Sequence, residues 1–157
     1  MTVSAQDRAR KIKIILFDVD GVWTDGTIWL FPFPVVAADG SSTTRMVEVK
    51  GYSAHDGAGI TLARLGGMKC GVITKRISET VAMRECGLAV AVANARERVK
   101  AEAHYVTPHR GGDGAARDAI EFILEAKGVL DKCIEASIDE SNPLPPSMDI
   151  GKGGDLK

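Results

Sequence analysis

The chain has few of the features that mark a secreted, membrane or nucleic-acid-binding protein. Its three cysteines, Cys70, Cys86 and Cys133, lie far apart with no Cys-x-x-Cys pair, which favours a reducing compartment and idle, apolar thiols. The formal net charge is −1, so no broad basic surface for nucleic acid is expected. The basic stretch 8–13 leads into an apolar run too short for a signal peptide or a membrane span. We therefore expect a cytoplasmic protein without nucleic-acid or membrane partners.

What the chain does contain fits one globular domain. Apolar residues make up 45% of the sequence and charged residues 26%, which is ordinary for such a domain at this length. We expect the folded part to span residues 1–137, with a frayed polar start over residues 1–10. The end of the chain, residues 138–157, is rich in proline, glycine and lysine and lacks apolar periodicity, so we expect it to be disordered.

One stretch organises the chain, the apolar run from Ile12 to Phe17 that ends in Asp18, Asp20 and Gly21. A short apolar run of this kind predicts a buried strand of a parallel sheet. Ligands of open α/β sheets bind outside the carboxyl ends of such strands. In extended chain, Asp18 and Asp20 leave the same face, and a hard cation such as Mg²⁺ relieves the repulsion between their carboxylates. The pair is therefore a candidate metal and catalytic site.

Three simpler interpretations compete on these few residues alone. The Asp-Gly pair is ordinary turn chemistry at the end of a strand. A calcium loop of the EF-hand type is a second possibility, but the glycine and the later acids stand at the wrong positions. The third possibility is the metal-binding Asp-x-Asp of a sugar-nucleotide transferase.

The longer string Asp18-Val-Asp20-Gly-Val-Trp-Thr-Asp25-Gly26 resembles the first motif of the haloacid dehalogenase (HAD) superfamily of phosphohydrolases. Within that superfamily it is most similar to the 3-deoxy-D-manno-octulosonate 8-phosphate (KDO 8-phosphate) phosphatase group. The resemblance implies a Rossmann-like parallel α/β sheet, with Asp18 as the nucleophile that forms an aspartyl-phosphate. It also implies that Asp20 is the general acid and base, and that both aspartates bind Mg²⁺, Asp20 through its backbone carbonyl. A carboxylate nucleophile suits this chemistry because it divides hydrolysis into two easier steps.

A β-hairpin is expected over residues 27–50. Aromatic and β-branched residues follow Gly26, Pro32 and Pro34 should break that strand, and the alternating stretch 45–50 reads as a returning strand. Relatives carry such a hairpin in place of a cap domain and use it to build a tetramer. Core packing is the alternative for its aromatic residues. We favour an oligomer contact, because a lone hairpin is marginal in water.

Further candidate substrate-binding residues lie in two strings. Asp56 is expected to cap a helix whose amides near Gly57 could face an anion, although His55 stands where relatives have arginine. Thr74 ends a second buried strand, matching the superfamily's second motif, where a hydroxyl holds a phosphate oxygen. Lys75 and Arg76 follow where relatives have Gly-Arg.

The resemblance is interrupted between Arg84 and Gly87. Relatives place there a strand, the lysine of the third motif, a helix and the acidic fourth motif, and a strand–helix–strand unit needs about 30 residues or more. The match resumes along Leu88–Ala93 and the Gly-rich string from Arg110 to Arg117. We expect a sheet narrowed by this internal deletion, with Leu88–Ala93 moved into the vacancy beside Ile12–Phe17.

Two functional hypotheses follow, and a damaged gene product is a third possibility. The first is a Mg²⁺-dependent phosphatase of small sugar acid phosphates such as KDO 8-phosphate, acting as a homo-oligomer, with Asp113 or another subunit completing the metal site. The second is a catalytically impaired relative that forms oligomers or binds ligands. The two hypotheses differ in whether catalysis survives without the missing lysine and acids. Losing a charge clamp in phosphoryl transfer costs several powers of ten in rate.

Overall fold

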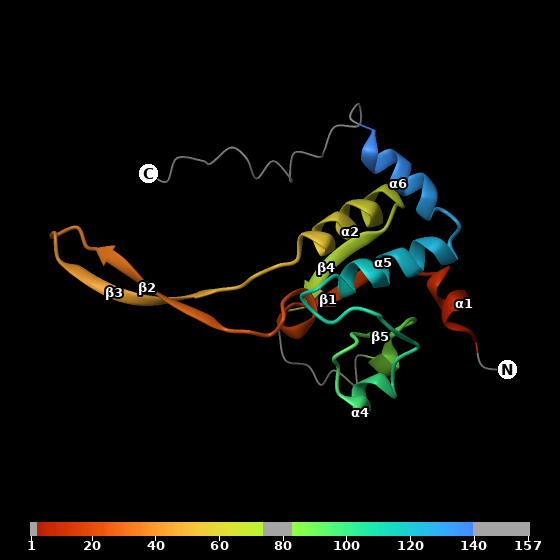
Figure 1. Cartoon of the computed structure of the whole chain (residues 1–157), viewed down its shortest axis with the longest axis horizontal. Coiled ribbons are helices and arrows are strands. Elements are labelled where there is room, and N and C mark those ends of the chain that lie inside the picture. Colours follow the sequence, from red (N-terminus) through yellow and green to blue (C-terminus); the bar gives the residue numbers. More distant parts are fainter. Residues whose placement is uncertain (1–2, 74–82, 140–157) are drawn as a thin grey trace.

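The computed structural model describes residues 3–73 and 83–139 as an α/β unit with a long projecting hairpin (Figure 1). Its elements begin with α1 (Ala5–Ala9), β1 (Ile14–Asp18), a tight loop (Val19–Trp23), β2 (Trp29–Val36), β3 (Ser42–Val49), α2 (Ala54–Leu65) and β4 (Lys69–Ile73). They continue with β5 (Val90–Ala91), α4 (Glu97–Lys100), β6 (Tyr105–Val106), α5 (Ala115–Ala126) and α6 (Leu130–Ile138). The predicted tail lies mostly outside the described residues.

The parallel pair β1–β4 is the framework of the unit. Its register runs from Ile14 opposite Lys69 to Asp18 opposite Ile73, so both strands end at the same edge. A parallel arrangement requires a crossover connection, and α2 supplies it. The predicted strand before Asp18 and the predicted parallel α/β class are confirmed. The strand is not buried as predicted, because Phe17 is the one buried residue of β1.

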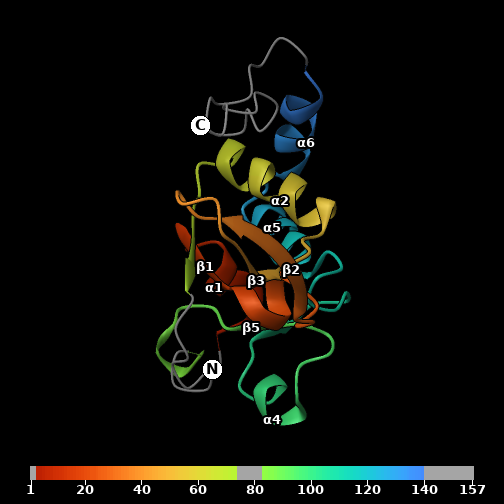
Figure 2. The ribbon, with the colours of Figure 1, turned by 90° about the vertical axis from the view of Figure 1, so that its left-hand side faces the viewer.

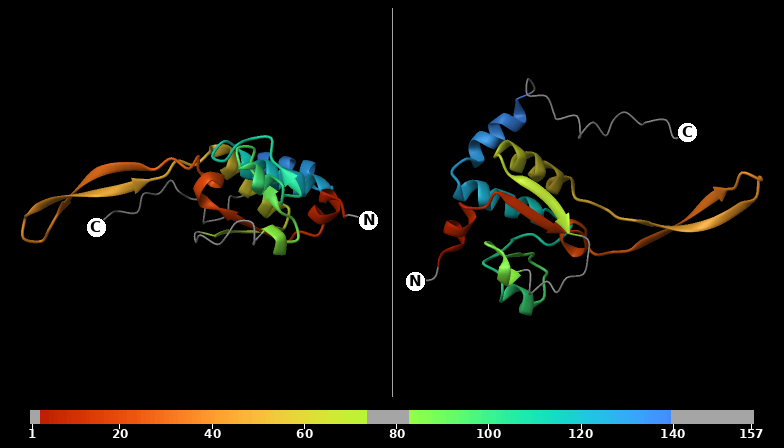
Figure 3. Two further views of the ribbon diagram at one scale, coloured as in Figure 1. Left: turned by 90° about the horizontal axis from the view of Figure 1, so that it is seen from below. Right: turned by 180° about the vertical axis from the view of Figure 1, so that it is seen from behind.

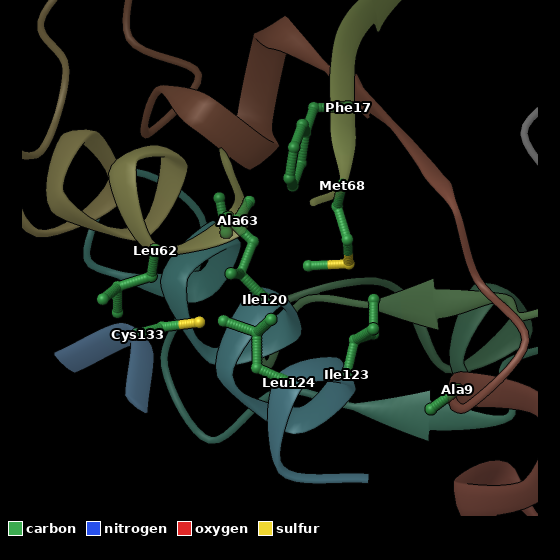
Figure 4. Packing of buried hydrophobic residues seen from close by; sticks show 10 residues of the cluster. Ala9, Phe17, Leu62, Ala63, Met68, Ile120, Ile123, Leu124 and Cys133 are labelled. Atoms are coloured by element: carbon green, nitrogen blue, oxygen red, sulfur yellow. The ribbon is translucent and has the colours of Figure 1, made fainter. Parts of the chain in front are cut away.

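Helices cover one face of this pair. α2 packs along α5, α6 packs against α2, and α1 packs against α5. Between them lies a core of buried apolar side chains that includes Phe17 from β1, Met68 before β4 and Ile120 from α5 (Figure 4). The other members are Ala9, Leu62, Ala63, Ala116, Ile123, Leu124 and Cys133.

The opposite face of β1–β4 is open among the described residues. Ile14 and Leu16 of β1 are 57% and 59% exposed, and Val72 of β4 is similarly exposed. The view from behind shows both strands with no helix drawn across them (Figure 3). Parallel sheets are normally covered on both faces, so this uncovered face marks where the unit is smaller than a complete doubly wound sheet.

The predicted shift of Leu88–Ala93 into a place beside β1 is wrong. β5 pairs in parallel with β6, Val90 opposite Tyr105, and in the described part of the chain β1 pairs only with β4. The strand is only two residues long, and Ala89 donates its amide to His104 Nδ1 at 2.9 Å. These local contacts hold the segment on β6 rather than on β1.

Two local expectations need correction. Within the predicted frayed segment, Ala5–Ala9 form the helix α1. Ser4 accepts a hydrogen bond from the Asp7 amide at its start, and Ala9 is fully buried. β2 continues through Pro32 and Pro34. A two-stranded ribbon has only edge strands, where proline's missing donor can face solvent.

The close contact between α2 and α5 depends on Gly59. A Cβ added at this position would lie 2.9 Å from the Cα of Arg117, a backbone atom that cannot rotate away. Gly57, two residues earlier in the same helix, has open space around it. The two glycines are therefore a matched pair for testing the packing.

We predict that Gly59→Ala lowers the free energy of unfolding by about 1–3 kcal/mol, because the added methyl overpacks the interface. Gly57→Ala should raise it by about 0.5–1 kcal/mol through better helix propensity. Urea unfolding of both variants measures the difference. Equal effects of the two substitutions would contradict the described α2–α5 contact.

Candidate active site

Asp18 and Asp20 lie at the carboxyl end of β1, as the sequence predicts. Asp18 is the last residue of the strand, and its partner across the sheet is Ile73, which directly precedes Thr74. Asp20 follows in extended backbone, and Gly21 then turns the chain with φ of +87°, a conformation that favours glycine. Both carboxylates are exposed at this edge of the sheet.

Thr24 holds the loop that carries the aspartates. Its side chain is buried, and its hydroxyl accepts hydrogen bonds from the amides of Gly21 and Gly26, each at 3.3 Å. The same hydroxyl donates to the Val19 carbonyl at 3.2 Å. A single threonine thus satisfies three backbone groups, which fixes the path of the chain immediately after Asp18.

The Gly-rich string from Arg110 packs directly on this loop. Gly112 donates its amide to the Val22 carbonyl at 3.0 Å, and a Cβ on Gly111 would overlap the Gly21 carbonyl. Gly111 and Gly112 are therefore needed for the close backbone approach of this string to the aspartate loop. Just after that loop, Asp25 accepts the Thr27 amide at 2.8 Å, and this hydrogen bond lowers the pKa of the Asp25 carboxyl.

Lys50 is a cation next to Asp20, and the sequence analysis does not predict it. Its Nζ lies 2.5 Å from Asp20 Oδ1 and 3.2 Å from Glu48 Oε1, and these hydrogen bonds raise the pKa of the lysine. The signal that could have found it is the hairpin. Because β2 begins soon after the aspartates, the strand that pairs with it must end near them.

Asp56 is not the helix cap that the sequence predicts. Ser53 caps α2 by accepting the His55 amide, while Asp56 is buried and its Oδ1 accepts the Arg117 amide of α5 at 3.0 Å. The amide of Gly57 donates to the Ser53 carbonyl at 3.4 Å, so it is not free to face an anion. Asp56 ties the first turn of α5 to α2, and substrate contact by these two residues remains a prediction.

Thr74, Lys75 and Arg76 lie outside the described residues. Asp113, the carboxylate expected to complete the metal site, lies 3.6 Å from Arg110 in an exposed ion pair. Among residues 3–73 and 83–139, no three His, Cys, Asp or Glu side chains gather as a metal cluster. The described donor set is therefore the Asp18–Asp20 pair. It still fits Mg²⁺, which proteins often bind through one or two carboxylates together with water and substrate phosphate.

No family model matches the chain. Two 3-deoxy-D-manno-octulosonate 8-phosphate phosphatases KdsC, from Salmonella typhi and Escherichia coli K12, are each 26% identical to it, covering 83% of this chain and 89% of the relative. Each alignment runs over 179 residues, more than this chain possesses, so the relatives contain positions with no counterpart here. This agrees with the predicted internal gap.

Comparison with solved structures also finds phosphatases, and these share the fold of the chain. The chain is similar to a probable YrbI family phosphatase from Pseudomonas syringae, with a TM-score of 0.70, 26% identity and coverage of 86% of this chain and 97% of that one. It also resembles the KDO 8-phosphate phosphatase of Moraxella catarrhalis, solved with magnesium ion, phosphate ion and KDO, with a TM-score of 0.66, 24% identity, and coverage of 85% and 97%.

The fold is thus that of the HAD hydrolases, as the sequence predicts. In sequence and in fold the chain is similar to KDO 8-phosphate phosphatases of the HAD superfamily. No helix in the described part of the chain is long and apolar enough to cross a membrane.

A histidine–aspartate pair anchors the Gly-rich string to α5. Asp118 accepts the backbone amide of His109 at 2.9 Å, and its carboxylate lies 3.0 Å from His109 Nδ1. The hydrogen bond to Asp118, strengthened by the nearby charges of Asp118, Asp113 and Asp56, raises the pKa of His109. The protonated form of the imidazole is therefore favoured in the folded state.

We predict that His109→Gln destabilises the protein more at pH 6 than at pH 9. A raised folded-state pKa gives stability that is fully present below the unfolded value of about 6.5 and is lost as pH rises through the folded value. Urea unfolding at both pH values measures this. NMR titration should place the pKa of His109 above the unfolded value and show it falling in Asp118→Asn; a folded-state pKa at or below the unfolded value would refute the pairing.

Proposed function

We propose that the chain is a Mg²⁺-dependent phosphatase of small sugar acid phosphates, of the KDO 8-phosphate type. The observation that carries the proposal is the position of Asp18 and Asp20 on a loop fixed by Thr24, at the carboxyl end of a parallel strand. The matched KdsC relatives are phosphatases. A KDO ligand and a phosphate ion in the Moraxella relative support the substrate class.

The two aspartates divide the reaction between them. An oxygen of Asp18 attacks phosphorus, the bond from phosphorus to the sugar oxygen breaks, and its electron pair leaves on that oxygen, which takes a proton from Asp20. Water then attacks phosphorus in the aspartyl-phosphate and gives a proton to Asp20. Inorganic phosphate departs and the Asp18 carboxylate is restored.

The Asp18 carboxylate and the backbone carbonyl of Asp20 would hold Mg²⁺. When bound, this ion neutralises phosphate charge that would otherwise repel Asp18. The proposed substrate-binding residues are Thr74, with its hydroxyl on a phosphate oxygen, and the cationic side chains of Lys75 and Arg76. The register of β1 with β4 supports this proposal, because Ile73, which precedes Thr74 in the sequence, is opposite Asp18.

We predict that phosphate release from KDO 8-phosphate requires Mg²⁺ and falls by at least about a thousandfold in Asp18→Asn, which removes the nucleophile. A colorimetric phosphate assay over a panel of sugar phosphates measures this, with Asp7→Asn on α1 as a control aspartate outside the site. Release that continues unchanged in Asp18→Asn would refute the assignment of the nucleophile.

The second candidate is a catalytically impaired relative that binds ligands or assembles without turnover. It is favoured because, in the described part of the chain, no three His, Cys, Asp or Glu side chains are grouped so that they could hold a metal ion. Folded, oligomeric protein that releases no phosphate from any member of the panel would support this candidate over the first.

We also propose that the hairpin assembles the chain into a homotetramer. Cross-strand partners place Trp29, Phe31 and Phe33 on the same face of the ribbon as Val47 and Val49. Trp29 is 54% exposed and Phe33 is 60% exposed. The ribbon extends well away from the helices (Figure 1 and Figure 3) and points toward the viewer in Figure 2, so nothing described in a single chain covers this apolar face. A second copy would bury it.

We predict that the double substitution Trp29→Ser, Phe31→Ser converts oligomer to monomer, because it removes two aromatic anchors from that face. Light scattering coupled to size-exclusion chromatography gives the mass of each species. The control is Thr44→Ser, on the other face of the ribbon, which should leave the oligomer intact. A wild-type monomer at micromolar concentration would rule out the assembly.

A further inference from the structure

Lys50 occupies a defined position between two carboxylates. Its ammonium nitrogen lies 2.5 Å from Asp20 Oδ1 and 3.2 Å from Glu48 Oε1. The side chain of Lys50 is 30% exposed, while that of Asp20 is 69% exposed. The lysine is therefore more enclosed than the carboxylate that it contacts, and the open side of the pair is at Asp20.

The hairpin sets this position. Trp29, the first residue of β2, pairs with Val49, the last residue of β3, so Lys50 emerges where the ribbon returns to the aspartate loop. Glu48 precedes Lys50 by two residues and leaves the same face of an extended strand. It holds the ammonium from a second side, which restricts the long lysine side chain to the neighbourhood of Asp20.

Stability is a weak explanation for this arrangement. Ion pairs between exposed side chains contribute little to the free energy of folding. The cluster also remains negative overall, because Asp20, Glu48 and nearby Asp18 outnumber the one lysine. A phosphoryl dianion that approaches Asp18 would be repelled. In the described part of the chain, Lys50 is the cation that forms an ion pair with Asp20.

We propose that Lys50 is a phosphoryl-binding and positioning residue of this site. Its ammonium holds the Asp20 carboxylate beside Asp18 and takes up charge of the substrate's phosphoryl group, a task for which the chain lacks the lysine of the third motif. An ammonium has three donors, and Asp20 and Glu48 use two, so one remains for a phosphoryl oxygen. This inference rests on the proposed function for its substrate.

The test compares Lys50→Met and Lys50→Arg with a matched control, Lys100→Met. Lys100 also pairs with a carboxylate, Glu97 at 2.9 Å, and its side chain is 26% exposed, but it lies on α4. Titration calorimetry with inorganic phosphate in the presence of Mg²⁺ measures binding, and steady-state kinetics with KDO 8-phosphate separates kcat from KM. Circular dichroism and thermal unfolding establish that each variant is folded.

We expect Lys50→Met to bind inorganic phosphate about tenfold or more weakly than wild type, and its kcat to fall by about a hundredfold, as when one charge-stabilising donor is removed. Lys50→Arg should recover part of both losses because it restores the charge, and Lys100→Met should match wild type. Rescue by arginine would not occur if Lys50 merely filled space.

The two proposals fail in different ways. Wild-type protein that binds phosphate through Lys50 yet hydrolyses no substrate would refute the phosphatase and leave the binding role of Lys50 standing. Lys50→Met that binds phosphate as tightly as Lys100→Met would overturn the role of Lys50, whatever the activity. A wild-type protein that binds no phosphate with Mg²⁺ present overturns it as well.

Discussion

The closure of the hairpin onto the aspartate loop is the constraint on which the rest of the site depends. The ribbon begins at Trp29, three residues after Gly26, and β2 and β3 pair along their full length, so the last residue of β3 must return to the place where β2 began. The Lys50 ammonium is thereby delivered to Asp20, and α2 then begins at Ala54 close by. The β2–β3 ladder therefore links the projecting hairpin, the ion pair between Asp20 and Lys50, and α2.

The loop after Asp18 is rigid for a different reason. Thr24 satisfies three backbone groups, and the glycines at 111 and 112 allow the later string to lie directly against the loop. Asp56, which sequence spacing suggests is a substrate contact, joins α2 to the first turn of α5. Many of the polar groups around the site therefore form hydrogen bonds that fix the backbone around Asp18 and Asp20, and they do not face solvent.

The sequence was informative wherever local pattern decides structure. The apolar run before Asp18, the second strand of the sheet and the hairpin over residues 27–50 are predicted elements that the structure contains. The predictions failed where distant contacts decide. Local sequence could not show that Ala9 packs into the core, that Ser53 rather than Asp56 caps α2, or that β5 pairs with β6. Lys50 was missed because it is 30 residues from its partner, and only the hairpin register brings them together.

The absent segment shapes both the fold and the chemistry. With β1 paired only to β4 among the described residues, Ile14 and Leu16 stay exposed on a face that a complete sheet would cover. The resemblance predicts that the same gap removes the lysine and acids of the third and fourth motifs. The most direct test of the central claim, that Asp18 accepts a phosphoryl group, is fluorine NMR of the protein with beryllofluoride, a phosphoryl mimic that binds aspartate. We expect a bound-fluoride signal that requires Mg²⁺ and disappears in Asp18→Asn. No bound signal from folded wild-type protein with Mg²⁺, or a signal that survives in Asp18→Asn, would contradict the account.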